Sequence, residues 1–122
     1  MNKYIDLIAR ILLAQLFIIA GVGKIMAYAG TQAYMSAMGV PGVLLPLVIL
    51  LEIGGGLALV FGWKTKWVSY ALAAFTIVAA LIFHHNLGDT VQRIMFMKDL
   101  AIAGGFLLLA INGTAGLSLD RK

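Results

Sequence analysis

The sequence predicts an all-α integral membrane protein, a bundle of four hydrophobic helices. Composition is the first reason: 62% of the 122 residues are hydrophobic and 11% are charged, and the mean hydropathy is +1.01. A soluble domain is under half apolar and about a quarter charged. The second reason is that four windows each approach the roughly 20 mostly apolar residues that a bilayer requires. The length allows one domain at most, so we expect residues 1–122 to form a single transmembrane domain.

The predicted spans cover about residues 4–26, 42–62, 67–86 and 94–111. Their apolar residues lie on every helix face, whereas helices of a soluble bundle keep polar outer stripes. The first span resembles a signal peptide because Lys3 precedes an apolar run. Arg10 interrupts that run, however, and Lys24 follows where a cleavage site would be expected, so we interpret it as a retained span.

The connections between the spans are short, except for one. Asn86 to Arg93 joins the last two spans, with Gly88-Asp89-Thr90 as turn residues. The longest connection lies between the first two spans, where Thr31 is expected to cap a short helix that ends at Gly39-Val40-Pro41. This segment contains no charged residue, which predicts an interfacial or re-entrant position.

The distribution of lysine and arginine predicts that both termini lie in the cytoplasm. In that orientation the outer connections carry only Arg93, with Lys24 near the end of the first span. Trp63 and Trp67 then belong to the inner aromatic belt. The cationic residues on the inner side are Lys3, Lys64, Lys66, Arg121 and Lys122. Since the cations form no run, membrane lipids are the predicted partners and nucleic acid is not.

Charged residues inside the spans are the candidate functional residues. A charge near the bilayer centre costs about 2.5–3.5 kcal/mol on insertion scales, so such residues face the bundle interior and find partners. Glu52 is expected close to the midplane, either neutral or in an ion pair with Lys24, Arg10 or Lys98. If the helices alternate in direction, the candidates for a ligand-binding or proton-relay site converge in the outer half of the bundle. They are Lys24, Glu52, His84, His85 and Lys98.

Each candidate also has a purely structural interpretation. Lys24 is near enough to a helix end to extend its ammonium to the interface. Arg10 is a structural ion-pair candidate, with Asp6 at i,i+4. Asp99 is a second such candidate, as a local partner for a cation. No metal site is predicted, because adjacent histidines on a helix point about 100° apart and no spaced carboxylate or cysteine accompanies them.

Rows of small residues predict where helices approach one another closely. In the second span, Gly54, Ala58 and Gly62 form such a row, and Gly55 and Gly56 neighbour Glu52. In the first span, one stripe combines polar and small residues: Arg10, Phe17, Gly21 and Lys24. In the fourth span, Lys98, Ala101 and Gly105 share a face.

Motifs along nearly the whole chain carry a family resemblance. They include Ala9-Arg10, Ala20-Gly21 with Lys24, Met38-Gly39-Val40-Pro41, Leu51-Glu52, Phe61-Gly62, the His84 region, Met97-Lys98 and Ser118-Leu119-Asp120-Arg121. In this order and spacing they resemble the DoxX family of bacterial inner-membrane proteins. One departure is Gly113-Thr114-Ala115-Gly116, where the family often has Gly-Pro-Gly.

The resemblance implies a multi-pass protein of the bacterial inner membrane that is linked to quinone chemistry. The family takes its name from a membrane subunit associated with a thiosulfate:quinone oxidoreductase, and relatives are linked to catechol or oxidative stress. A soluble oxidoreductase partner and a homo-oligomer are therefore both expected as possible assemblies. A quinone-like cofactor or a phenol-like ligand would accept hydrogen bonds from Lys24, His84 and Lys98, with Glu52 exchanging a proton.

Three classes of function remain open on the sequence alone. The first is an accessory membrane subunit that binds such a ligand, the second a small-molecule transporter, and the third a structural partner whose charges only hold the helices together. A self-contained redox enzyme has the least support, because the chain contains no cysteine, no nucleotide-binding glycine fingerprint and no convincing pair of haem ligands.

Overall fold

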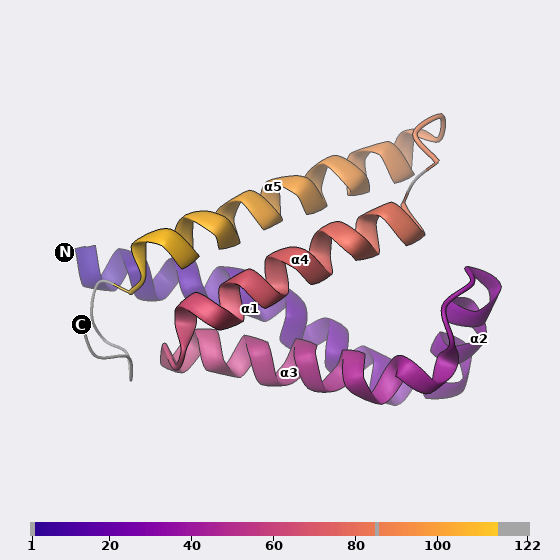
Figure 1. Ribbon diagram of the computed structural model, residues 1–122, viewed down its shortest axis with the longest axis horizontal. Coiled ribbons are helices and arrows are strands. Elements are labelled where there is room, and N and C mark those ends of the chain that lie inside the picture. The colour runs from indigo at the N-terminus through magenta and orange to yellow at the C-terminus, as the bar shows by residue number, and fades with distance from the viewer. Residues whose placement is uncertain (1, 85, 115–122) are drawn as a thin grey trace. The chain divides into compact units, whose positions relative to one another are not determined.

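The computed structural model describes residues 2–84 and 86–114, and its regular elements are all helical (Figure 1). They are α1 (Asn2–Met26), α2 (Tyr28–Ala37), the 3₁₀ helix η1 (Gly42–Leu44), α3 (Leu45–Phe61), α4 (Thr65–Phe83) and α5 (Thr90–Asn112). Four segments are long and apolar enough to cross a membrane: Lys3–Met26, Gly42–Phe61, Thr65–Phe83 and Thr90–Asn112. The predicted all-helical fold with four spans is confirmed.

The chain divides into two compact units, each built on a pair of long helices. Among the described residues, the first contains 2–64 and Thr114, and within it α1 packs against α3. The second contains Thr65–Gly113, and within it α4 packs against α5. Each pair is antiparallel (Figure 1). A short connection joins α4 to α5, whereas α2 and η1 reverse the direction of the chain between α1 and α3.

Glycines set the close contact between α1 and α3. A Cβ at Gly21 would lie 2.5 Å from Ile53 Cγ1, and a Cβ at Gly56 would lie 2.6 Å from Ile18 Cγ1. Gly54, which begins the predicted small-residue row, does not lie at this contact, since a Cβ there meets nothing within 4 Å beyond the backbone of its own helix. Residues 54 and 56 differ by about 200° around the helix, so only one of them can face α1.

The segment between α1 and α3 forms the predicted short helix, but it begins earlier than expected. α2 starts at Tyr28 after Ala27, and Thr31 lies inside it, where its Oγ1 donates to the carbonyl of Ala27 at 2.9 Å. Thr31 is therefore not the N-cap, because a threonine within a helix bonds instead to the carbonyl four residues before it. The predicted end is confirmed near Gly39, which has a φ of +82°, a left-handed conformation that favours glycine.

The other helix ends also differ slightly from the predicted spans. α3 ends at Phe61 and is capped by Gly62, which has a φ of +68°, and the Trp63 amide donates back to the carbonyl of Ala58 at 2.8 Å. α5 begins at Thr90, earlier than the predicted residue 94, because the Asp89 carboxylate caps it by accepting from the amide of Gln92 at 3.0 Å. His85, Ala115-Gly116 and the Ser118–Arg121 motif lie outside the described residues.

Candidate functional site

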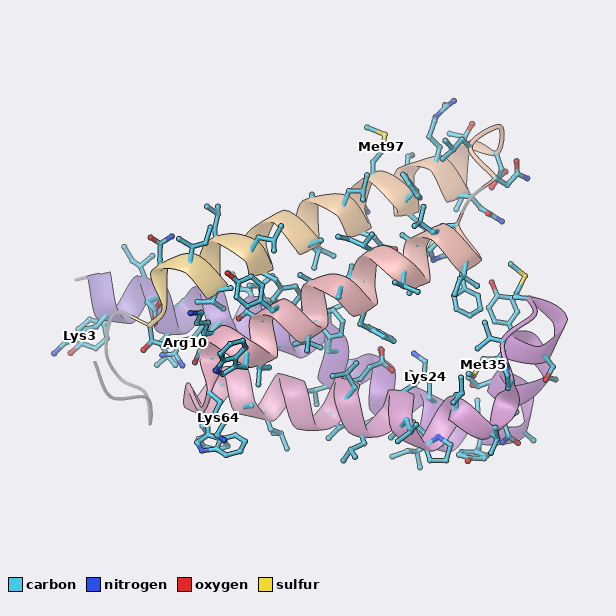
Figure 2. The ribbon with its side chains drawn as sticks, in the orientation of Figure 1. Lys3, Arg10, Lys24, Met35, Lys64 and Met97 are labelled. Atoms are coloured by element: carbon cyan, nitrogen blue, oxygen red, sulfur yellow. The ribbon has the colours of Figure 1, made fainter. Side chains whose placement is uncertain are left out.

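A lysine and a glutamate form an ion pair between the two helices of the first unit. Lys24 Nζ, on α1, lies 2.9 Å from Glu52 Oε1 and 3.2 Å from Oε2, on α3 (Figure 2). Both residues lie within segments that are long and apolar enough to cross a membrane. Lys24, Arg10 and Lys98 were the predicted candidates for the partner of Glu52, and Lys24 is the one that pairs with it in the structure.

Local packing explains why these two side chains meet. Gly21 precedes Lys24 by one helical turn and lies on the same face of α1. A Cβ at Gly21 would lie 3.4 Å from Glu52 Cβ, so the missing side chain allows α3 to approach at this level. The predicted stripe that joins Gly21 to Lys24 is therefore the part of α1 that receives Glu52.

The two partners differ in how far they are covered. The Glu52 side chain is 5% exposed, whereas the Lys24 side chain is 28% exposed. Only Glu52 Oε2 accepts a hydrogen bond from Nζ, and Oε1 is buried without a hydrogen-bond donor among the described residues. Oε1, at 2.9 Å, takes part in the ion pair without a hydrogen bond. A ligand that reached this site would meet the ammonium first, with the carboxylate behind it.

Arg10, itself fully buried, forms a separate cluster nearer the start of α1. Its Nε donates to Asp6 at 2.9 Å, which confirms the i,i+4 pair considered from the sequence. Its Nη1 donates to the carbonyls of Leu59 and Val60, at 2.9 and 3.1 Å, in the last turn of α3. The last carbonyls of a helix have few local donors, and Arg10 supplies one here beside the Gly62 amide, which donates to the Leu59 carbonyl at 3.2 Å. This geometry is that of a structural clamp between α1 and α3.

The second unit contains the remaining predicted residues. His84 directly follows α4, and Lys98 and Asp99 lie on α5. Asp99 is half-buried, and its expected role as a local partner for a cation stays a prediction. Lys98 is exposed, because Asp99 rather than Lys98 shares the α5 face that buries Ala103 and Phe106. The expected convergence of His84 and Lys98 with Glu52 stays a prediction.

Sequence reasoning missed the hydroxyl residues on α4. Thr65, Ser69 and Thr76 are all buried, and their spacing places them on one face of the helix. Thr76 Oγ1 donates to the carbonyl of Leu72 at 2.7 Å, whereas Ser69 Oγ has no hydrogen-bond partner among the described residues. Their i, i+4 and i+11 spacing was the available signal, but hydroxyls cost little in a span and did not stand out beside the charges.

Four spans with a charged pair enclosed by the first helix pair define a small multi-pass membrane protein. Residues 5–85 match the DoxX family model, and the chain belongs to this family. It is 59% identical to the Escherichia coli inner membrane protein YqjF over 94% of this chain and 88% of that protein. It is 39% identical to the E. coli inner membrane protein YphA over 95% and 88%. It is an inner membrane protein, as these relatives are.

A more distant relative carries a functional name. The chain is 28% identical to the Bacillus subtilis protein named "Putative oxidoreductase CatD", over 98% of this chain and 90% of that protein. No solved structure matches the chain. The family model and the relatives thus identify the family and the membrane, while the chemistry has to be argued from the ion pair.

Proposed function

We propose that the protein binds a quinone- or phenol-like ligand at Lys24 and Glu52, as an accessory membrane subunit of an oxidoreductase or stress-response system. The single observation that carries this proposal is the unequal exposure of the pair. The Lys24 side chain is 28% exposed, while Glu52 is buried behind it at 5%. The exposed ammonium is accessible to a ligand, while the buried carboxylate holds it in place.

The chemistry of the pair fits a neutral ring with an oxygen at its edge. An ammonium group has three hydrogen-bond donors, and the contacts of Lys24 to one carboxylate leave capacity for a carbonyl or phenolic oxygen. The pair is neutral as a whole, so a neutral ligand adds no net charge to the membrane interior, where unpaired charge is expensive. Glu52 holds the ammonium in place, and its carboxylate can exchange a proton with the ligand.

The comparisons support this proposal only in a general way. One distant relative is named as an oxidoreductase, and its name does not specify a ligand. His84 and Lys98 are proposed as additional ligand donors, and Asp99 as the residue that orients His84. Lys98 is exposed, so its side chain is the least covered by protein of these three.

A binding experiment tests the assignment of Lys24. Menadione, a small naphthoquinone, is titrated into the purified protein in nanodiscs and its binding is followed calorimetrically. A hydrogen bond to a charged group contributes about 1.5–3 kcal/mol, so Lys24→Gln is expected to weaken binding by roughly ten- to a hundredfold. Arg93→Gln removes one exposed positive charge in the second unit and serves as the matched control, with unchanged affinity.

Two results would contradict the proposal. Unchanged menadione and catechol binding in Glu52→Gln combined with Lys98→Met would show that the site lies elsewhere. The direct contact between Lys24 and Glu52 also favours a second candidate, a structural partner whose ion pair only joins α1 and α3. Replacing a buried pair by apolar residues is often neutral or stabilising. If Lys24→Met/Glu52→Leu kept ligand binding and the cellular phenotype, this structural role would be the correct one.

A further inference from the structure

The charged residues of each unit are distributed unevenly between its two ends. In the first unit, Lys3 and Lys64 lie at one end of the α1/α3 pair, as Figure 2 shows for their labelled side chains. At the opposite end, residues 25–51 contain no charged side chain, and Lys24 is neutralised by Glu52. The described acid nearest the lysine end is Asp6, which is bonded to Arg10. This end is therefore net cationic.

The lysines at this end stand beside exposed aromatic rings. Lys3 Nζ lies 5.3 Å from the centroid of the Tyr4 ring, and Lys64 Nζ lies 5.1 Å from the centroid of the Trp63 ring. Tyr4 and Trp63 are 55% and 52% exposed. Tyrosine and tryptophan prefer the level of the lipid headgroups, because one part of the ring is apolar and another forms hydrogen bonds. The rings thus hold the ammonium groups at headgroup depth.

The second unit repeats the arrangement at the start of α4. Lys66 Nζ lies 5.3 Å from the centroid of Trp67, whose ring lies 6.4 Å from that of Tyr70. At the other end of this unit, two cations, Arg93 and Lys98, are balanced by two acids, Asp89 and Asp99. Each unit, taken by itself, combines lysine with exposed aromatic residues at one end and has no net charge at the other.

From this asymmetry we propose that the lysine–aromatic pairs bind the phosphate of anionic phospholipid headgroups. An ammonium group at headgroup depth recognises phosphate as a point charge, and the neighbouring ring contacts the glycerol and upper acyl region. A zwitterionic headgroup carries its own cation beside the phosphate and offers no net charge to a lysine. The proposal is independent of the ligand at Lys24 and Glu52.

Lipid retention measured by native mass spectrometry tests this proposal. The full chain in detergent is titrated with palmitoyl-oleoyl phosphatidylglycerol or with phosphatidylcholine of the same chains. An attraction of about 1 kcal/mol per lysine near an anionic surface corresponds to roughly a fivefold change in affinity. The triple variant Lys3→Gln/Lys64→Gln/Lys66→Gln is expected to lose roughly fivefold in phosphatidylglycerol affinity at each lysine–aromatic pair, with little change for phosphatidylcholine.

Matched variants separate headgroup binding from general effects. The triple arginine variant, Lys3→Arg/Lys64→Arg/Lys66→Arg, keeps the charge and is expected to retain the preference for phosphatidylglycerol. Arg93→Gln removes one charge from the opposite end of the second unit and is expected to have no effect. Equal affinities of the unmodified protein for the two lipids, or a loss in Arg93→Gln as large as in Lys66→Gln, would overturn the proposal.

Discussion

Arg10 lies fully buried inside a hydrophobic span and is bonded to several acceptors at once. Its guanidinium pairs with Asp6 on its own helix and with the carbonyls of Leu59 and Val60 on α3. The last carbonyls of a helix have no partner within that helix, and lipid offers none. One residue therefore neutralises an acid and completes the end of a neighbouring helix. Its planar, forked donors make this possible, whereas the point charge of a lysine does not.

Replacement of Arg10 tests this residue-scale description. Arg10→Lys keeps the charge but loses the fork. Arg10→Met also removes the donor to Asp6 and to the carbonyls of Leu59 and Val60, of which Leu59 keeps the Gly62 amide at 3.2 Å. Breaking a buried pair by removing one partner costs about 3–5 kcal/mol, so Arg10→Met is expected to approach that loss and Arg10→Lys to lose less. Unfolding in mixed micelles, followed by far-ultraviolet circular dichroism, measures both. Equal stability of Arg10→Met and the parent would contradict the clamp.

Single residues were only partly predictable from the sequence. The pair of Arg10 with Asp6 followed from spacing, and the need of Glu52 for a cationic partner followed from the cost of a charge in a membrane. The choice among Lys24, Arg10 and Lys98 as the partner of Glu52 did not, because it depends on the register between helices. Arg10 is engaged by backbone carbonyls of α3, and a sequence contains no direct sign of such acceptors.

At the scale of elements, helix existence was predictable and helix contact was not. The four spans follow from runs of apolar residues, and only their ends shifted, as where Asp89 caps α5 at Thr90. The face that each helix presents was harder to predict, because a span is apolar all round and has no polar side to orient it. α3 contains several glycines on different faces, and the one packed closely against Ile18 is Gly56.

Two glycine variants on α3 test the element-scale packing. A Cβ at Gly56 would lie 2.6 Å from Ile18 Cγ1 and 3.2 Å from the carbonyl oxygen of Ala14, so Gly56→Ala forces α1 and α3 apart. Overpacking of this kind costs about 1–3 kcal/mol. Gly54→Ala is the matched control and is expected to be neutral or to stabilise by up to about 1 kcal/mol, since alanine favours helix. Thermal unfolding of both variants in detergent measures the difference, and equal effects would contradict the packing.

At the scale of the whole molecule, the ends of the spans are defined by charge. Most of the exposed cations among the described residues lie at three helix ends. They are Lys3 at the start of α1, Lys64 after the end of α3 and Lys66 at the start of α4. Composition and these lysines predicted the membrane and the multi-pass fold, both of which the family and the spans confirm. Which side of the membrane each end faces was predicted from the same lysines and remains to be measured.

Cysteine labelling tests the predicted orientation, and the absence of native cysteine gives a clean background. Gly88 precedes α5 and Asn112 is its last residue, so they mark its two ends, and both are exposed. With lysine-rich ends in the cytoplasm, an impermeant maleimide added to intact spheroplasts should label Gly88→Cys and spare Asn112→Cys until the membrane is permeabilised. The opposite pattern would place Lys66 and its aromatic neighbours on the outer side. The anionic headgroups proposed to bind there would then belong to the outer leaflet, and the lysines would no longer explain the topology.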